Sequence, residues 1–233
     1  MRNRSFANSP RGGALAAGTI LGAVCAAGAG AGPIVSSILA SEDGDVHYTG
    51  LSNYAVNTTS AAVVSVRSGG NNVRNGVYVF DLGSIPSWAI VTGATLRLTT
   101  GALISNVGST ADVFFQAYAS DGTITVDDHQ NFLSAAQVAM ETFTVGTSAN
   151  TPLTIDFDDL APLQAAIDDG ASFLSVRSTT VNFVTFSIRS LESTVGVEFK
   201  PTLELTYIPS PGSAALMCLA IGVMAPRRRA RRA

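Results

Sequence analysis

The sequence predicts an all-β body that folds as a single β-sandwich of the jelly-roll type, with two short helices that cap it. Three observations predict this fold. Between residues 42 and 208, runs rich in Val, Thr, Phe and Tyr alternate with short stretches of Gly, Asn, Asp and Ser, a pattern typical of β-sandwiches. No repeat or linker divides these residues, and a body of about 165 residues is long enough to bury a core. Both cysteines, Cys25 and Cys218, lie outside the body, so its core forms without a disulfide.

The predicted strands combine β-branched or aromatic residues with alternating polarity. They span residues 45–49, 62–66, 76–82, 93–100, 112–119, 151–157, 172–178, 183–190 and 201–207. In the segment 93–100, Leu96 and Leu98 share one face of the strand. Thr95, Arg97 and Thr99 share the other face. We therefore expect the two leucines to lie in the core.

Two segments interrupt the β pattern. Residues 127–140 and 158–170 place apolar residues at spacings of three and four, which predicts helices. The second segment begins with Asp158 and Asp159, which are good helix caps, and ends at Gly170, a residue type that often terminates helices. We expect both helices to cap the sandwich.

Residues 1–40 have the organisation of a secretory signal peptide. Their first part is basic and contains Arg2, Arg4 and Arg11. An Ala/Gly-rich apolar stretch follows, and its small residues offer several cleavage sites, near Ala29, Ala31 and Ala40. A buried Ala/Gly helix is the alternative, but it leaves the basic residues without a role. We therefore expect an N-terminal signal helix that is removed on export.

The C-terminal segment, residues 209–233, has three parts. Pro209, Ser210 and Pro211 form an extended joint, because prolines stop a helix from running back into the body. The uncharged run 212–225 would span about 21 Å as a helix, against a hydrocarbon core of about 30 Å. An arginine cluster follows, with Arg227, Arg228, Arg229, Arg231 and Arg232. The positive-inside bias keeps this cluster in the cytoplasm, so we expect a short membrane helix with the body exported.

The body is strongly acidic. All seventeen acidic residues lie between Glu42 and Glu204, together with only six basic residues, which gives this part a net charge of −11. Such a surface repels phosphate backbones and disfavours nucleic-acid binding. Asp43 and Asp45 flank a glycine and carry the oxygen ligands that hard cations prefer. A structural calcium at these two residues is therefore the one expected cofactor, and a solvated strand start is the alternative.

Trp88 is the candidate ligand-binding residue. It lies in a turn after a proline, where an indole can stack on a sugar ring, although it can equally close the end of the core. Four tyrosines supply further aromatic surface in the body: Tyr48, Tyr54, Tyr78 and Tyr118.

The sequence predicts no catalytic residues. His47 and His129 are the only histidines, and the sequence assigns neither of them a metal partner or a triad partner. Carboxylates such as Asp127 and Asp128 are adjacent along the chain, whereas a glycosidase needs two acids that face each other across a cleft. We therefore expect the protein not to be an enzyme.

Three blocks of the body resemble the DNRLRE domain, a family of exported bacterial β-sandwiches. Residues 76–98 contain a strand that ends in Phe-Asp-Leu, an Ile-Pro turn and the strand Ala-Thr-Leu-Arg-Leu. Residues 154–170 are similar to the family's strand and short helix. Residues 186–207 are similar to its Arg-Ser-x-Glu segment and its closing Pro-x-Leu-x-x-x-Tyr strand. The resemblance implies a β-sandwich and, because some members are carbohydrate-binding modules, a sugar ligand.

The C-terminal segment resembles the PEP-CTERM sorting signal of Gram-negative bacteria that build an extracellular polymeric matrix. The order of Pro-x-Pro motif, apolar helix and terminal arginine cluster matches, with Pro-Ser-Pro in place of the usual Pro-Glu-Pro. The resemblance implies that an exosortase-type protease removes the tail after secretion through the translocon. A simple C-terminal membrane anchor is the alternative.

These observations together predict an exported, non-catalytic module at the bacterial envelope surface or in the extracellular matrix. It is expected to bind or embed in extracellular polysaccharide. Two other classes remain open. A structural coat or adhesion protein would contact proteins and have no sugar site. A polysaccharide lyase or hydrolase would need a cleft that brings His129 or a carboxylate within hydrogen-bond reach of a second titratable group.

Overall fold

The computed structural model of the chain describes residues 32–209, except for 49, 51–52, 59–62, 68–72, 102–104, 107, 131–134, 182–183 and 195–199. Residues Pro33–Ile208 form one compact unit. Residues 1–31 of the predicted signal peptide lie outside the described residues, as do Ser210, Pro211, Arg227, Arg228 and Arg229. The last part of that segment, residues 34–40, is not helical but belongs to a β-strand, so a signal helix that reaches residue 40 is wrong. In the described part of the chain, no helix is both long enough and apolar enough to span a membrane.

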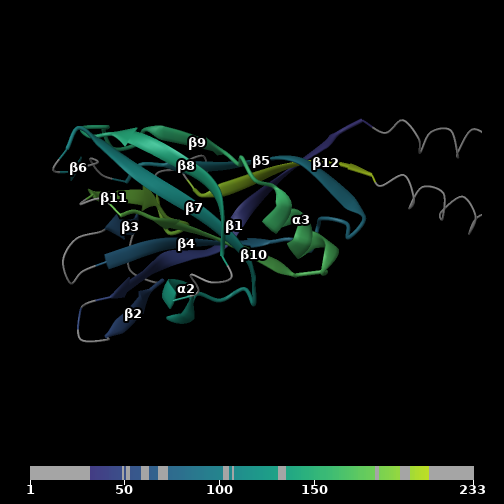
Figure 1. Cartoon of the computed structure of the whole chain (residues 1–233), viewed down its shortest axis with the longest axis horizontal. Coiled ribbons are helices and arrows are strands. Elements are labelled where there is room, and N and C mark those ends of the chain that lie inside the picture. Colours follow the sequence, from purple (N-terminus) through teal and green to yellow (C-terminus); the bar gives the residue numbers. More distant parts are fainter. Residues whose placement is uncertain are drawn as a thin grey trace, which may run out of the picture. The chain divides into compact units, whose positions relative to one another are not determined.

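The described residues form strands almost throughout, with two short helices (Figure 1). The strands are β1 (Ile34–Tyr48), β2 (Tyr54–Asn57), β3 (Val63–Arg67), β4 (Val73–Asp81), β5 (Ala89–Thr99), β6 (Ser105–Asn106), β7 (Thr110–Ser120), β8 (Ala136–Thr144), β9 (Pro152–Asp156), β10 (Phe173–Thr179), β11 (Val184–Arg189) and β12 (Thr202–Pro209). The helices are α2 (Asp127–Gln130) and α3 (Ala161–Asp168). The prediction of an all-β fold of the sandwich or barrel-like kind is confirmed.

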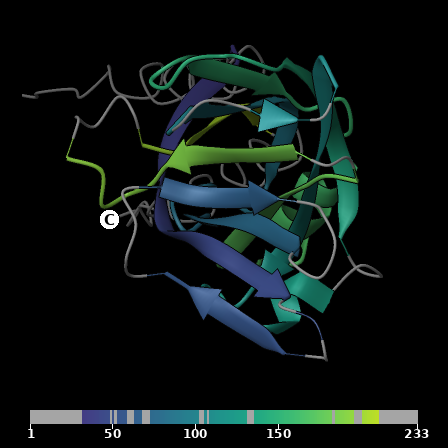
Figure 2. The same cartoon turned by 90° about the vertical axis from the view of Figure 1, so that its left-hand side faces the viewer.

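The strands form two sheets that share β1, as Figure 1 and Figure 2 show. The first sheet has the order β1-β12-β5-β9. The second sheet has the order β2-β1-β4-β10-β7-β8. From β4 the pairing continues through β3, β11 and β6. A bridge between Thr100 and Ile188 links the end of β5 to β11, so the sheets nearly close on each other.

β1 belongs to both sheets because it contains a β-bulge. Its first half pairs with β12 up to Leu39, and its second half pairs with β4 from Ala40 to Tyr48. The register shifts between Ala40 and Glu42. A bulge bends a strand and increases its twist. The bend carries this strand of 15 residues from the first sheet into the second.

The main core lies between the sheets and includes the inward-facing residues Tyr78, Phe80, Leu96, Leu98 and Phe115. The prediction that Leu96 and Leu98 are core residues is confirmed. A smaller cluster is formed by Val46, Val77, Val79 and Ile124, with Phe173 packed against it. Because successive strand residues point to opposite faces, Val77 and Val79 face away from the main core. We call their side of the second sheet its outer face.

The helix predicted at 158–170 is confirmed as α3. The Ala161 N–H donates to Asp159 Oδ1 over 2.9 Å, so Asp159 satisfies one of the free N–H groups at the helix start. The helix stops just before Gly170, whose φ of 69° is a left-handed conformation that glycine adopts without strain.

The helix predicted at 127–140 is wrong over most of its length. α2 ends at Gln130, and β8 begins at Ala136. The β7–β8 register shifts between Phe115 and Gln116, and the resulting bulge lets both Val138 and Ala139 be buried. Because two adjacent residues are buried, the sequence of β8 lacks the alternation of apolar and polar residues that marks a strand. Its apolar residues are instead spaced as they would be in a helix. Pairing with β7 decides the structure, since strand propensity depends on tertiary context.

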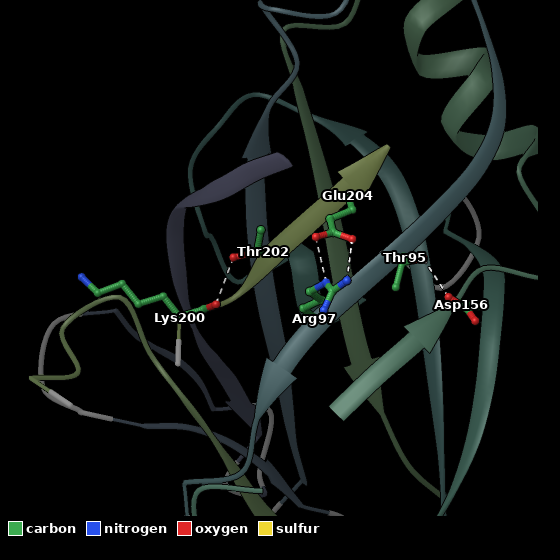
Figure 3. Close-up of polar contacts among 6 residues, drawn as sticks. All are labelled: Thr95, Arg97, Asp156, Lys200, Thr202 and Glu204. Atoms are coloured by element: carbon green, nitrogen blue, oxygen red, sulfur yellow. Dashed lines mark hydrogen bonds and ion pairs between the residues drawn. The ribbon is translucent and has the colours of Figure 1, made fainter. Parts of the chain in front are cut away.

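The exposed face of the first sheet carries cross-strand polar contacts (Figure 3). Arg97 of β5 and Glu204 of β12 form a two-pronged ion pair, with Nε–Oε1 at 2.8 Å and Nη2–Oε2 at 2.9 Å. Thr95 donates its hydroxyl to Asp156 Oδ1 of β9 over 2.7 Å. These side chains lie on the face opposite Leu96 and Leu98, as the alternation predicts.

Replacing Arg97 with alanine is expected to lower the free energy of unfolding by only about 0.5–1 kcal/mol, because exposed ion pairs contribute little. Arg97 is 55% exposed in this pair. Urea denaturation of the two single variants and of the double variant with Glu204→Ala measures the coupling energy. A coupling energy above about 2 kcal/mol would contradict the assignment of this pair as a solvent-screened contact.

Candidate functional site

A cavity of about 290 Å³ lies on the outer face of the second sheet, beside α2. Its apolar wall consists of Val73, Phe114 and Val181. Its polar groups are amides, an imidazole and hydroxyls, from Asn75, Gln116, His129, Thr179 and Thr180. The volume lies just below the range of about 300–1,000 Å³ that small-molecule sites occupy.

Strand alternation places these residues on the outer face. Asn75 is in step with Val77 on β4, and both therefore face away from the main core. On β7, Phe114 and Gln116 lie on either side of Phe115, which is buried in the main core. The cavity is therefore formed where β4, β10 and β7 turn their outer side chains toward α2.

The turn after β7 carries the chain across this face. Gly122 has a φ of 92°, and a Cβ at this position would lie 2.7 Å from the ring of Phe173, so the turn requires glycine. Asp121 Oδ1 accepts hydrogen bonds from the N–H and the hydroxyl of Thr123, at 3.0 and 2.8 Å. The chain then places Ile124 in the smaller core cluster. This packing brings α2 to the sheet.

The side chain of Asp128 holds the start of α2. Asp128 Oδ2 accepts the N–H of Thr125 over 2.6 Å, and Asp128 Oδ1 accepts the hydroxyl of Tyr118 over 2.6 Å. Burial, followed by the hydrogen bond and the charge of Asp128, raises the pKa of Tyr118. The Tyr118 hydroxyl therefore stays protonated and ties the first turn of α2 to β7.

Arg177 of β10 holds the other end of α2. Its side chain is fully buried, and its Nη1 donates to the carbonyls of Asp128 and His129 at 2.8 and 3.2 Å. Its Nε and Nη2 donate to Gln116 Oε1 at 3.0 and 2.5 Å. Burial lowers the pKa of Arg177, and electrostatic interactions with Tyr118 and Asp128 oppose this effect. Arg177 therefore positions both Gln116 and His129, two of the residues that line the cavity.

Three rings cluster beside the cavity. The ring of Tyr54 meets that of His129 edge-on with 5.1 Å between centroids, and Tyr48 lies 5.2 Å from Tyr54 and 6.5 Å from His129. Tyr48 and Tyr54 are both half-buried, so part of each ring faces solvent. By contrast, Tyr78 and Tyr118 are buried. Of the predicted aromatic candidates, Tyr48 and Tyr54 thus lie next to this cavity, whereas Tyr118 borders a different one.

Two polar atoms at the cavity are buried and have no hydrogen-bond partner, namely Asn75 Oδ1 and His129 Nε2. The Asn75 side chain belongs to a residue that is only 1% exposed. An unpaired buried polar atom costs about 1–3 kcal/mol, so such atoms call for an explanation such as a ligand or an ordered water. Burial, and then the nearby Arg177, lower the pKa of His129. The imidazole is therefore neutral at pH 7.

Trp88, the predicted ligand-binding residue, lies at the opposite end of β4 from Asn75. It is half-buried and belongs to neither core cluster. A smaller cavity of about 210 Å³ near this turn is lined by Ser87 and Ile85 rather than by the indole. The structure therefore does not bring Trp88 together with the other candidate residues.

The carboxylates predicted to bind calcium, Asp43 and Asp45, are both buried. Asp45 Oδ2 accepts a hydrogen bond from the Asn57 amide over 3.1 Å. Asp45 Oδ1 lies 3.5 Å from Arg74 Nη1 and 3.6 Å from His47 Nδ1, and it has no hydrogen-bond partner. Asp43 Oδ2 accepts the N–H of Leu191 over 2.8 Å, and Asp43 Oδ1 has no hydrogen-bond partner. No group of three or more His, Cys, Asp or Glu residues within the described ranges is arranged to hold a metal. The structural calcium stays a prediction.

Sequence reasoning does not identify Asn75, Gln116 or Arg177 as site residues. Of these three residues, only Arg177 stands out in the sequence, because it is a single basic residue in a strand of apolar and small residues, Phe173–Thr179. Such a residue indicates a buried partner. Asn75 and Gln116 carry no comparable signal, because alternation alone does not reveal that the outer face is covered.

No protein-family model and no curated protein matches this sequence. One solved structure that matches is described as the structure of infectious bursal disease virus Gx strain, with 10% sequence identity and a TM-score of 0.20. The alignment covers 76% of this chain and 38% of that one. A superposition this loose carries no argument about fold or function.

Proposed function

We propose that the protein is an exported, non-catalytic module that attaches to extracellular polysaccharide through the cavity on the outer face of the second sheet. One observation carries this proposal. The cavity combines an apolar wall with unpaired polar atoms of Asn75 and His129, and the half-buried rings of Tyr48 and Tyr54 pack beside it against His129.

The chemistry of a sugar ring suits this combination. Its C–H face packs on aromatic and aliphatic side chains, and its hydroxyls form hydrogen bonds with amide, imidazole and hydroxyl groups. The residues that line the cavity with His129 are amides, threonines and apolar residues. This set suits binding better than acid–base catalysis, which needs a second titratable group.

We further propose that the body is a DNRLRE-like jelly roll, and that its two ends direct its location. The N-terminal signal peptide, which ends before β1, sends the chain through the translocon. The PEP-CTERM-like segment at 209–233 presents it to an exosortase-type protease, with transient membrane contact through the 212–225 helix. The mature protein then resides at the envelope surface or in the matrix.

The N-terminus of the mature protein is expected to lie between residues 30 and 33, after cleavage near Ala29 or Ala31. β1 begins at Ile34, and Ile38 and Ala40 are buried in the main core. A cut after Ala40 would remove both side chains and the pairing with β12, and so is disfavoured. N-terminal sequencing of protein secreted by the native host tests this expectation, and a mature chain that starts at residue 41 contradicts it.

The proposed function is tested by titrating the purified full-length protein with a panel of neutral and acidic polysaccharides, with and without calcium. Wild-type protein is expected to bind saturably. Asn75→Ala is expected to weaken binding by about tenfold, the effect of losing roughly 1.4 kcal/mol of contact energy. Trp88→Ala, at the other end of β4, is the matched control and should bind like wild type.

Other results would redirect the proposal. Absence of binding across the whole panel favours a structural coat or adhesion protein that has no sugar site. Loss of binding in Trp88→Ala but not in Asn75→Ala moves the site to the turn after β4. Release of new reducing ends or unsaturated products from a polysaccharide would indicate a hydrolase or lyase.

A further inference from the structure

We infer that the cavity on the outer face of the second sheet binds an uncharged sugar residue and discriminates against uronic acids. This inference rests on the proposed function and adds the chemical class of the ligand. It depends on three features: the uncharged groups that line the cavity, the internal hydrogen bonds of Arg177 and the net negative charge of the body.

The cavity offers no ionic partner to a carboxylate. All of its polar lining groups are uncharged, since they come from Asn75, Gln116, Thr179, Thr180 and the neutral imidazole of His129.

Arg177, a cation that contacts the lining residues Gln116 and His129, has its hydrogen-bond donors occupied within the protein. Its side chain is fully buried, and its nitrogens donate to Gln116 Oε1 and to the carbonyls of Asp128 and His129. It does not line the cavity. A uronate bound there would lose hydration without gaining an ion pair, which costs several kcal/mol. A neutral sugar loses only hydroxyl hydration, and the amide, imidazole and hydroxyl groups can replace it.

Long-range electrostatics act in the same direction. The body between Glu42 and Glu204 has a net charge of −11, and a field of one sign lowers the local concentration of polymers of the same sign. An acidic polysaccharide is therefore repelled by the negative body as it approaches, and its carboxylates lose hydration when it binds. An uncharged polysaccharide meets no such repulsion and loses only the hydration of its hydroxyls.

The experiment compares sugars that differ only in charge. Calorimetric titration of the full-length protein uses oligosaccharides of glucose, galactose and mannose, and those of the corresponding uronic acids. At least one neutral oligosaccharide is expected to bind ten times or more tightly than its uronate counterpart. The difference should shrink when salt is raised, because the long-range part is screened.

A variant at the edge of the cavity tests the charge argument without disturbing the core. Val181 lines the cavity and is 74% exposed, so Val181→Lys should fold normally. It is expected to raise uronate affinity about threefold, as an exposed ion pair would. The matched control is Val35→Lys on the first sheet, a position that is 66% exposed and should leave both affinities unchanged.

The outcomes separate this inference from the proposed function. Uronates that bind as tightly as neutral sugars, with binding that Asn75→Ala abolishes, overturn the inference and leave the proposed function standing. Failure of every oligosaccharide and polysaccharide to bind overturns both. Neutral-sugar binding that neither Asn75→Ala nor Val181→Lys alters also overturns the inference, because the ligand then lies elsewhere.

Discussion

Replacing Arg177 with methionine is expected to lower the free energy of unfolding by about 3 kcal/mol or more and to abolish ligand binding. The variant leaves Gln116 Oε1 and the carbonyls of Asp128 and His129 without a donor, and each buried unpaired acceptor costs about 1–3 kcal/mol. It also removes the cation beside the buried Asp128, which adds the cost of an uncompensated charge. For a body of this size the melting temperature should fall by roughly 6–12 °C.

Thermal melting and hydrogen exchange check this prediction together. Amides of residues 121–130 should lose protection first, because Arg177 holds α2 to the sheet. Arg97→Met removes a guanidinium of the same size from the exposed face of the first sheet (Figure 3) and is the matched control. If both variants melted within 2 °C of wild type, Arg177 would not have the anchoring role assigned to it. Arg177→Lys should rescue only part of the loss, since an ammonium cannot reach three acceptors in a fork geometry.

The protein is expected to become less stable as the pH rises from about 4 to about 7, and Asp43→Asn is expected to remove most of this dependence. Burial, which outweighs the hydrogen bond from Leu191, raises the pKa of Asp43 to about 7 from 3.8. Glu192 also raises this pKa, whereas Lys200 opposes the shift. The folded protein therefore binds the Asp43 proton more tightly than the unfolded chain does. Ionising Asp43 costs stability up to a ceiling of about 4 kcal/mol.

Urea denaturation between pH 4 and pH 8 measures the effect. Asn resembles the protonated acid, so Asp43→Asn should match wild type near pH 4 and exceed it at pH 8. Asp156→Asn changes an exposed carboxylate on the first sheet and should keep the pH profile of the wild type. Parallel profiles for wild type and Asp43→Asn would rule out Asp43 as the group responsible.

Local patterns predict the parts of the fold in which one face is buried and the other is exposed. Leu96 and Leu98 alternate with Thr95 and Arg97, and the structure buries only the leucines of this set in the main core. α3 is similarly predictable, because its acidic start and Gly170 mark its ends. In both cases the sequence pattern and the tertiary structure favour the same conformation.

The remaining features depend on pairing that the sequence does not display. Val138 and Ala139 are both buried at a bulge, so β8 lacks the alternation by which a strand is recognised. The turn at Gly122 and α2 cover the outer face of the second sheet. Asn75 and Arg177 are buried because of this cover. Calcium binding is predicted at Asp45 without knowledge of its contacts with Arg74 and His47. Arg74 comes from the neighbouring strand β4, and His47 lies two positions further along β1.

The pairing of the first strand with the last also determines the order of folding. The hydroxyls of Ser36 and Tyr207 lie 3.4 Å apart although 171 positions separate them along the chain, and contacts of such long range slow folding. A chain delivered N-terminus first must wait for β12 before the first half of β1 finds its partner. Until then Ile38 and Ala40 stay uncovered on an open edge, the kind of edge at which chains aggregate. Closure of the first sheet is therefore the last step, because it requires β12, which ends at Pro209.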